Sequence, residues 1–216
     1  MAVPTSAART GARGTGGGSA SSGSTCPRCS ARSRLRCSRS SRALARQAEL
    51  DKELEAVAGT APYREPVGWL RCFRGIDTLS AIILLAEIVD FQRFRRPREL
   101  MAYLGLVPSE YSSGESQRRG ALTKAGNSHA RRVLVEAAWH YRHRPTIGRA
   151  LASRSQGQPD EIVGQAWRAQ QRLHRRYRHL VGHGKRPPIA VAAIARELVG
   201  FIWAAMTRPE NRRQAA

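Results

Sequence analysis

Apolar side chains recur every three or four residues through most of the chain after residue 43, the pattern of amphipathic helices. One such stripe follows Asn127 or Ser128, either of which can cap a helix, and runs to about His143. Two more occupy about 160–180 and 189–206. The stripe residues are Ala130, Val133, Leu134, Ala137, Ala138 and Tyr141; then Ile162, Ala166, Ala169, Leu173, Tyr177 and Leu180; then Ile194, Leu198 and Ile202. With no convincing strand and no internal repeat, the sequence predicts an all-α fold, a compact helical domain that contains a helix-hairpin-helix-like element.

The N-terminal part has a different composition. Residues 1–42 are rich in Ser, Arg and Gly, and no acidic residue precedes Glu49. A segment without an apolar period cannot bury enough surface to offset its chain entropy, so a disordered basic arm is predicted. The arm is interpreted either as a coat for nucleic acid or as GC-rich DNA read out of frame. Residues 43–66 are predicted to be a helix and linker, 67–206 the helical domain and 207–216 a tail.

The charge of the chain points to a polyanionic partner. There are 37 Lys and Arg against 16 Asp and Glu, a formal net charge of +21. Nucleic acid is the favoured partner, because Lys and Arg neutralise phosphates and release counterions, and an acidic membrane surface is the weaker alternative. No apolar run reaches the ~18 residues of a membrane span, and the N-terminus lacks the apolar region of a secretory signal. We therefore expect a cytoplasmic protein with no membrane partner.

Metal sites and familiar catalytic motifs find little support in the sequence. Cys26, Cys29 and Cys37 supply three zinc ligands, but no fourth follows at finger spacing. His140 and His143 sit three residues apart, a spacing that is more often that of exposed helix side chains than of ligands. The acids of the folded part are scattered, unlike a two-metal nuclease, and no phosphate-binding loop or nucleophile elbow occurs. No cofactor or metal is predicted for this chain.

A helical hairpin is predicted between residues 69 and 88. Gly75 in its turn permits close backbone approach, and Asp77 or Thr78 can cap the second helix. The turn of a helix-hairpin-helix meets phosphate without reading bases, and Gly75 is predicted to do so here. An acid at Asp77 weakens that interpretation, and an ordinary packed hairpin is the alternative. The connector that follows carries Arg95 and Arg96, which are predicted to contact the nucleic-acid backbone.

The stretch from Tyr103 to Gly126, interpreted as a loop, is the strongest candidate for chemistry. In it Ser112 and Ser113 directly precede a glycine, and basic residues follow. A serine that attacks phosphorus needs a shaped loop, positive charge and a base or metal; the first two are present and the third is not evident. A turn whose serines bond the backbone is the alternative. The residues predicted to meet phosphate in and after this stretch are Arg118, Arg119, Lys124, Asn127, Arg131 and Arg132.

Several motifs of this region match a known family. They are the Gly-Ile hairpin, the Phe-Arg element, Tyr-Leu-Gly-Leu-Val-Pro, Ser-Ser-Gly, Lys-Ala-Gly-Asn and Arg-Arg-x-Leu-x-x-Ala-Ala. Residues 68–143 resemble the C-terminal transposase domain of the insertion-sequence 110 family, the Piv-like, bridge-RNA-guided DEDD/serine transposases. The resemblance implies DNA strand exchange in transposition through a covalent serine–DNA intermediate. It implies Ser113 as the nucleophile, with Ser112 as the second choice.

The same resemblance implies partners and a second half of the active site. It implies DNA, a guide (bridge) RNA, a homo-oligomer and an N-terminal RuvC-like domain whose four acids bind Mg²⁺. That domain has no counterpart before residue 43, so we expect a truncated or frame-shifted transposase that is inactive alone. The alternative is a non-catalytic helical nucleic-acid-binding protein in which Ser113 is only a turn residue.

Overall fold

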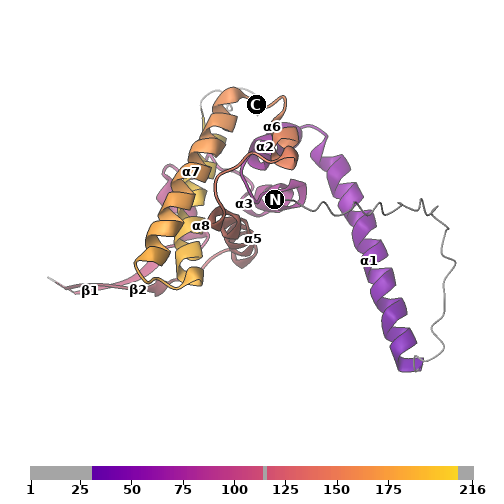
Figure 1. Cartoon of the computed structure of the whole chain (residues 1–216), viewed down its shortest axis with the longest axis horizontal. Helices are drawn as coiled ribbons and strands as arrows, with labels where there is room; N and C mark the ends of the chain where they lie inside the picture. The colour runs from indigo at the N-terminus through magenta and orange to yellow at the C-terminus, as the bar shows by residue number, and fades with distance from the viewer. Residues whose placement is uncertain (1–30, 114–115, 209–216) are drawn as a thin grey trace, which may run out of the picture. The chain divides into compact units, whose positions relative to one another are not determined.

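The computed structural model describes residues 31–113 and 116–208, and these residues are predominantly helical (Figure 1). In chain order the elements are α1 (Ala31–Ala58), α2 (Arg64–Arg71), α3 (Thr78–Ile88), α4 (Pro97–Tyr103), β1 (Pro108–Ser113), β2 (Ser116–Leu122), α5 (Ser128–Trp139), the 3₁₀ turn η1 (His140–Arg142), α6 (Arg149–Ser155), α7 (Asp160–Gly182) and α8 (Pro187–Met206). The predicted all-α class is confirmed, with one small two-stranded sheet added to it.

Contacts between Cα atoms divide the chain into two units, Met1–Ala45 and Arg46–Ala216, and α1 runs from one to the other. The second unit contains the hydrophobic core and all the candidate site residues from Gly75 to Arg132. The predicted domain boundaries after residues 42, 66 and 206 stay predictions. The zinc-ligand candidates Cys26 and Cys29 and the tail from residue 209 lie outside the described residues.

The core is built around α8. Its buried side chains run from Ala190 to Met206 along one broad face of the helix, and α2, α4, α5 and α7 all pack against it. By length and composition alone α8 is apolar enough to cross a membrane, but half of that window is buried inside the protein, as in the core helix of a globular domain. The three predicted apolar stripes supply much of the core. The stripe residues of α5 and η1 and those of α8 are all buried, and those of α7 are buried from Ile162 to Leu173.

Helix ends follow the chemistry expected from the sequence. The Asp77 carboxylate accepts a hydrogen bond from the Ser80 amide at 2.8 Å and caps α3. The Asn127 side-chain oxygen accepts from the Ala130 amide at 2.9 Å and caps α5. Pro97 occupies the first turn of α4, where its missing N–H costs nothing. Both predicted caps are therefore confirmed, and each satisfies an amide that the helix leaves without a partner.

Two predictions about secondary structure in the helical domain are wrong. The stretch after α4, expected to be a loop, forms the antiparallel hairpin β1–β2. The sequence of this ribbon has no alternation of apolar and polar residues, so it lacks the pattern by which a half-buried strand is recognised. The segment 144–158, also expected to be a loop, contains α6, because the seven residues between Gly148 and Gln156 are enough for two turns and Leu151 is buried.

Helix α1 begins before the helix that was predicted from residue 43. Residues 31–42, assigned to the basic arm from their composition, are the first turns of α1. Extending an existing helix adds one hydrogen bond for each residue fixed, whereas nucleating one is costly, so Ala, Arg and Leu continue the helix predicted from residue 43 toward the N-terminus.

Candidate nucleic-acid interface

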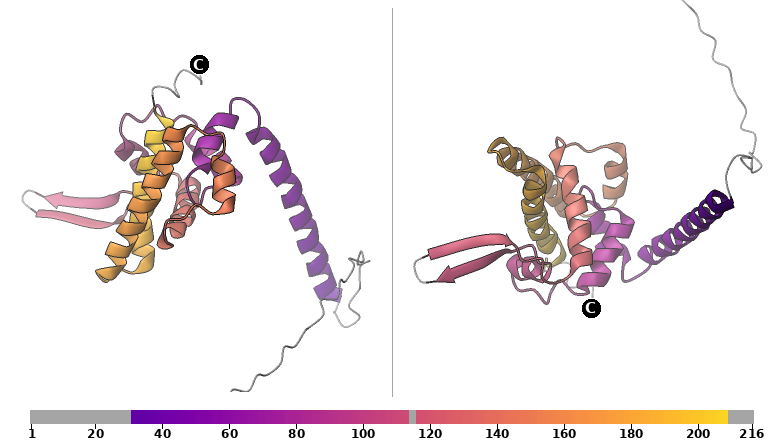
Figure 2. Two further views of the ribbon diagram at one scale, coloured as in Figure 1. Left: turned by 45° about the horizontal axis from the view of Figure 1, so that its top comes forward. Right: turned by 90° about the horizontal axis from the view of Figure 1, so that it is seen from below.

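The predicted nucleophile lies at the far end of the β1–β2 hairpin. Ser113 pairs with Ser116 at the last position of the ladder, and Ser112 pairs with Gln117. The strands pair chiefly with each other and stand out from the helices (Figure 2). The hairpin therefore carries the paired serines away from the hydrophobic core.

The register separates the two serines. Because positions alternate across a strand, position 113 shares a face with Tyr111 and its partner Arg118. Position 112 shares the opposite face with Glu110 and its partner Arg119. Each serine position is thus on the face of one arginine position, but the face of Ser113 carries no acidic position in the described ladder. An anion is repelled less on that face.

The base of the hairpin is held between the end of α4 and the start of α5. The Thr123 amide donates to the Val107 carbonyl at 2.9 Å, and the Lys124 amide donates to the Gly105 carbonyl at 3.2 Å. Gly105 (φ +64°) and Gly126 (φ +92°) make this close approach possible. A Cβ on Gly105 would collide with the Ala125 carbonyl oxygen. The hairpin therefore leaves the helical domain at a fixed position.

Lys124 itself has a left-handed backbone (φ +53°), which costs a residue other than glycine about 1–3 kcal/mol. Its side chain is exposed beside the hairpin base. The fixed positive charge predicted at this position is thus available to a ligand.

Asn127, Arg131 and Arg132, predicted to meet phosphate, are brought together at the start of α5, and each makes contacts within the protein. Besides capping α5, Asn127 donates from Nδ2 to a Glu87 carboxylate oxygen at 2.5 Å. The half-buried Arg131 donates from Nη1 to the Leu104 carbonyl at 2.9 Å. Arg132 pairs with an acid one turn along α5 at 3.2 Å and remains exposed. Through these contacts Asn127 and Arg131 stabilise the base of the hairpin.

Glu87 is a residue whose role the sequence did not reveal. It lies near the end of α3, accepts from Asn127 and pairs with His129 Nδ1 at 2.8 Å, while its backbone carbonyl accepts from the Tyr103 hydroxyl at 2.9 Å. Hydrogen bonds from Asn127 and then His129 lower the pKa of this carboxyl below its ordinary value. The contact is long-range, from residue 87 to residues 127 and 129, so no local pattern marks it. A carboxylate therefore already occupies the positive end of α5.

The α2–α3 turn is packed rather than open. Gly75 has φ +86°, and a Cβ there would lie 2.6 Å from the Ala137 carbonyl oxygen and 2.8 Å from the His140 ring. Arg154 donates to the Ile76 carbonyl at 2.7 Å. A cavity of about 370 Å³ opens beside the turn, lined by Arg74, Gly75, Asp77, His140, Thr146, Gly148, Ala150, Leu151 and Arg154. Close helix packing explains the glycine, and its contact with phosphate stays a prediction.

The electrostatics of that cavity favour a neutral imidazole. Burial first, and then the positive charges of Arg74 and His143, lower the pKa of His140. Arg95 and Arg96 lie apart from this cavity, exposed at the start of α4, where the Arg95 amide donates to Glu99 at 2.8 Å.

The described residues do not fit a metal ion. In the part of the chain that the structure covers, no three His, Cys, Asp or Glu side chains converge to hold one. His143 is instead in contact with Arg142, whose Nε lies 3.0 Å from the ring nitrogen. The Mg²⁺ that the family resemblance implies therefore has no ligand set among these residues.

Comparison with known proteins decides the family. Residues 69–152, which include the α2–α3 turn, the hairpin and α5, match the profile of the transposase IS116/IS110/IS902 family. This segment is an IS110-family transposase domain. The resemblance noted from the sequence is confirmed.

Named transposases align with more of the chain. The putative transposase y4qE of Sinorhizobium fredii is 47% identical over 135 residues, which are 62% of this chain and 35% of that protein. The transposase for insertion sequence element IS1533 of Leptospira borgpetersenii is 35% identical over 132 residues, 61% of this chain and 38% of that protein. The transposase for IS1111A of Coxiella burnetii is 29% identical over 168 residues, 78% of this chain and 39% of that protein. The chain thus spans somewhat more than a third of the length of these relatives.

Proposed function

We propose that this chain is the nucleophile-bearing part of a DNA transposase, which binds DNA and exchanges its strands through Ser113. The observation that carries the proposal is the position of Ser113, at the end of a projecting hairpin inside the segment that matches the family. Its register also favours it over Ser112, because the face of Ser113 pairs with an arginine position and has no acidic one.

In the proposed step the Ser113 hydroxyl oxygen attacks a DNA phosphorus atom and loses its proton. The bond from phosphorus to one deoxyribose oxygen breaks, and that oxygen takes up a proton and leaves as a hydroxyl. One phosphodiester linkage is exchanged for a phosphoserine ester, so the reverse attack by another strand end rejoins DNA without an external energy source. Arg118, on the face of Ser113, is proposed to neutralise the non-bridging oxygens of this phosphate, and Arg119 and Lys124 those of neighbouring phosphates.

Further residues are proposed to bind the DNA or RNA backbone outside this step. They are Gly75, Arg95, Arg96, Asn127, Arg131 and Arg132. Arg95, Arg96 and Arg132 are exposed and suit direct contact, whereas Asn127 and Arg131 act by holding the hairpin base.

We propose that the carboxylates and Mg²⁺ that activate Ser113 come from a RuvC-like domain on another polypeptide segment, and that a guide RNA and further copies of the chain complete the assembly. The scattered acids of the described residues support this division. The complex would act on DNA in the cytoplasm.

The test is covalent capture on nicked donor DNA. The purified chain is mixed with the separately expressed N-terminal part of the y4qE relative, and denaturing gels report protein–DNA adducts. Ser113→Ala should abolish the adduct, while the adjacent Ser112→Ala, the matched control, should retain it. Loss with Ser112→Ala alone would move the nucleophile by one residue. Adducts that form with Ser112→Ala and equally with Ser113→Ala would show that neither serine is the nucleophile, and would favour the alternative in which this chain only binds nucleic acid. Complete strand exchange by the chain alone would refute the proposal that the carboxylates and Mg²⁺ come from another polypeptide segment.

A further inference from the structure

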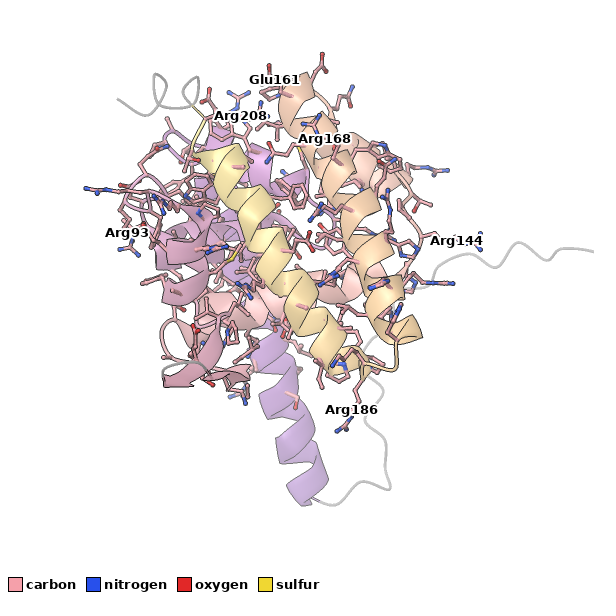
Figure 3. All side chains as sticks on the ribbon, turned by 90° about the vertical axis from the view of Figure 1, so that its left-hand side faces the viewer. Arg93, Arg144, Glu161, Arg168, Arg186 and Arg208 are labelled. Carbon is pink, nitrogen blue, oxygen red and sulfur yellow. The ribbon has the colours of Figure 1, made fainter. Side chains whose placement is uncertain are left out.

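A basic groove runs between α7 and α8, which lie side by side with Glu161, Arg168 and Arg208 at one end and Arg186 at the other (Figure 3). Two adjoining hollows of about 320 and 510 Å³ form this α7–α8 groove, and they share Arg172 and Glu197. Its basic lining residues are Arg168, Arg172, Arg175, Arg176, His179 and Arg208. The groove uses none of the residues assigned above to the hairpin interface.

The arginines of α7 form a row along the helix. Arg168, Arg172, Arg175 and His179 are separated by three or four residues, so they project from one face, one turn of about 5.4 Å apart. From Arg168 to His179 the row is roughly 16 Å long at 1.5 Å for each residue. All four side chains are exposed. A straight row of this kind suits a regularly spaced polyanion.

The positive charge of the row is poorly compensated. Between residues 160 and 208 there are nine Lys or Arg and three Asp or Glu. Arg172 pairs with Glu197, and Arg208 pairs with Glu161. Within the described part of the chain, Arg168, Arg175 and Arg176 form no ion pair with an acid. Like charges held this close repel one another unless an anionic partner is bound.

The lining of the groove distinguishes between classes of partner. Among the residues that line the two hollows, Phe201 alone is a Phe, Tyr or Trp, so the groove lacks the succession of aromatic side chains on which unpaired bases stack. An acidic amphipathic peptide needs an apolar floor along its length. Met101, Phe201 and Ala204 supply one in the larger hollow only, and the arginine row continues past it into a hollow lined by charged side chains and His179.

We propose that the α7–α8 groove binds the sugar–phosphate backbone of double-stranded nucleic acid without reading its sequence. This second surface holds a duplex whether or not Ser113 performs chemistry. Each arginine of the row neutralises one phosphate and releases counterions, so the row contributes to the salt dependence of binding. Glu197 opposes binding, because its carboxylate holds Arg172 and repels phosphate.

The experiment measures fluorescence anisotropy of labelled mixed-sequence duplex DNA, duplex RNA and single-stranded DNA against the full chain over a range of salt. Arg175→Gln should lower affinity for both duplexes several-fold and reduce the slope of log K against log salt by about 0.9. Arg178→Gln is the matched control, because it is exposed on the same helix but does not line the groove. Arg168→Gln combined with Arg175→Gln should roughly double the change in slope. Glu197→Gln should tighten binding.

If Arg175→Gln and Arg178→Gln lowered duplex affinity equally, the proposal would be overturned, because affinity would then depend on the net charge of the chain and not on the groove. It would also be overturned if Glu197→Gln left duplex affinity unchanged, or if single-stranded DNA lost as much affinity as the duplexes. If Arg175→Gln left duplex binding unchanged but abolished binding of an acidic peptide copied from residues 47–57, the groove would be assigned to a protein partner and the proposal overturned. Duplex anisotropy of Arg175→Gln reports on the groove and adduct formation by Ser113→Ala reports on the proposed nucleophile, so failure of the one and failure of the other are separable.

Discussion

Replacing Gly126 by alanine tests how firmly the base of the hairpin is fixed. Gly126 has φ +92°, and a Cβ there would collide with the Tyr103 carbonyl oxygen, which accepts the Asn127 amide at 3.1 Å. The left-handed backbone costs alanine about 1–2 kcal/mol, and losing that hydrogen bond costs about 0.5–1.5 kcal/mol more. The free energy of unfolding should fall by about 2–3 kcal/mol, which lowers Tm by roughly 4–12 °C in a domain of this size.

Two other glycines separate backbone strain from collision in the same thermal unfolding assay. Gly157 also has positive φ (+74°), but no atom lies within 4 Å of its added Cβ, so Gly157→Ala should cost only the backbone strain of about 1–2 kcal/mol. Gly164 lies inside α7 with open space around it, so Gly164→Ala should stabilise by about 0.5–1 kcal/mol. If Gly126→Ala proved no more costly than Gly157→Ala, the tight approach of Tyr103 to Gly126 would be refuted.

Two further predictions concern the core and the acid response. Ile194 is fully buried on α8, so Ile194→Ala should lower the free energy of unfolding in urea by about 2–5 kcal/mol. The exposed control Ile189→Ala should lower it by less than about 0.5 kcal/mol. Similar values for the two variants would show that α8 is not the centre of the core. Because the folded-state pKa of Glu87 lies below its ordinary value, its contribution to stability is complete above about pH 4.3 and is lost as pH falls through the folded pKa. Glu87→Gln should therefore make the free energy of unfolding fall less between neutral and acid pH, and the exposed control Glu136→Gln should have a smaller effect on that fall. If the free energy of unfolding of Glu87→Gln depended on pH as that of the unsubstituted chain does, the lowered pKa of Glu87 would be contradicted.

The sequence was informative where local chemistry determines structure. Asp77 and Asn127 were recognisable as caps because a cap acts on an amide three residues away. Apolar periodicity found the faces of α5 and α8 because burial selects every third or fourth residue. The hairpin is not evident from the sequence because its Ser, Gln and Arg positions show no alternation of apolar and polar residues.

The candidate site was predictable in composition but not in arrangement. The paired serines and following arginines were evident, but which arginine position shares a face with Ser113 depends on strand register, and no strand was expected. The contact of Glu87 with Asn127 and His129 joins residues about 40 positions apart, beyond the reach of local patterns. Arg131 was expected to face phosphate, and only the fold shows that it bonds the Leu104 carbonyl.

The central position of α8 has a consequence for the protein made from a damaged copy of the gene. α2, α4, α5 and α7 are all synthesised before α8, so the apolar surface that each of them buries against α8 stays uncovered until the ribosome has released residues 187–206. A stop codon or deletion that removes only this last helix would leave the serines and arginines of the hairpin encoded and yet yield a chain exposed to proteases. Gene copies that lose this short 3′ segment should therefore yield little intact protein, although they still encode Ser113, Arg118, Arg119 and Lys124.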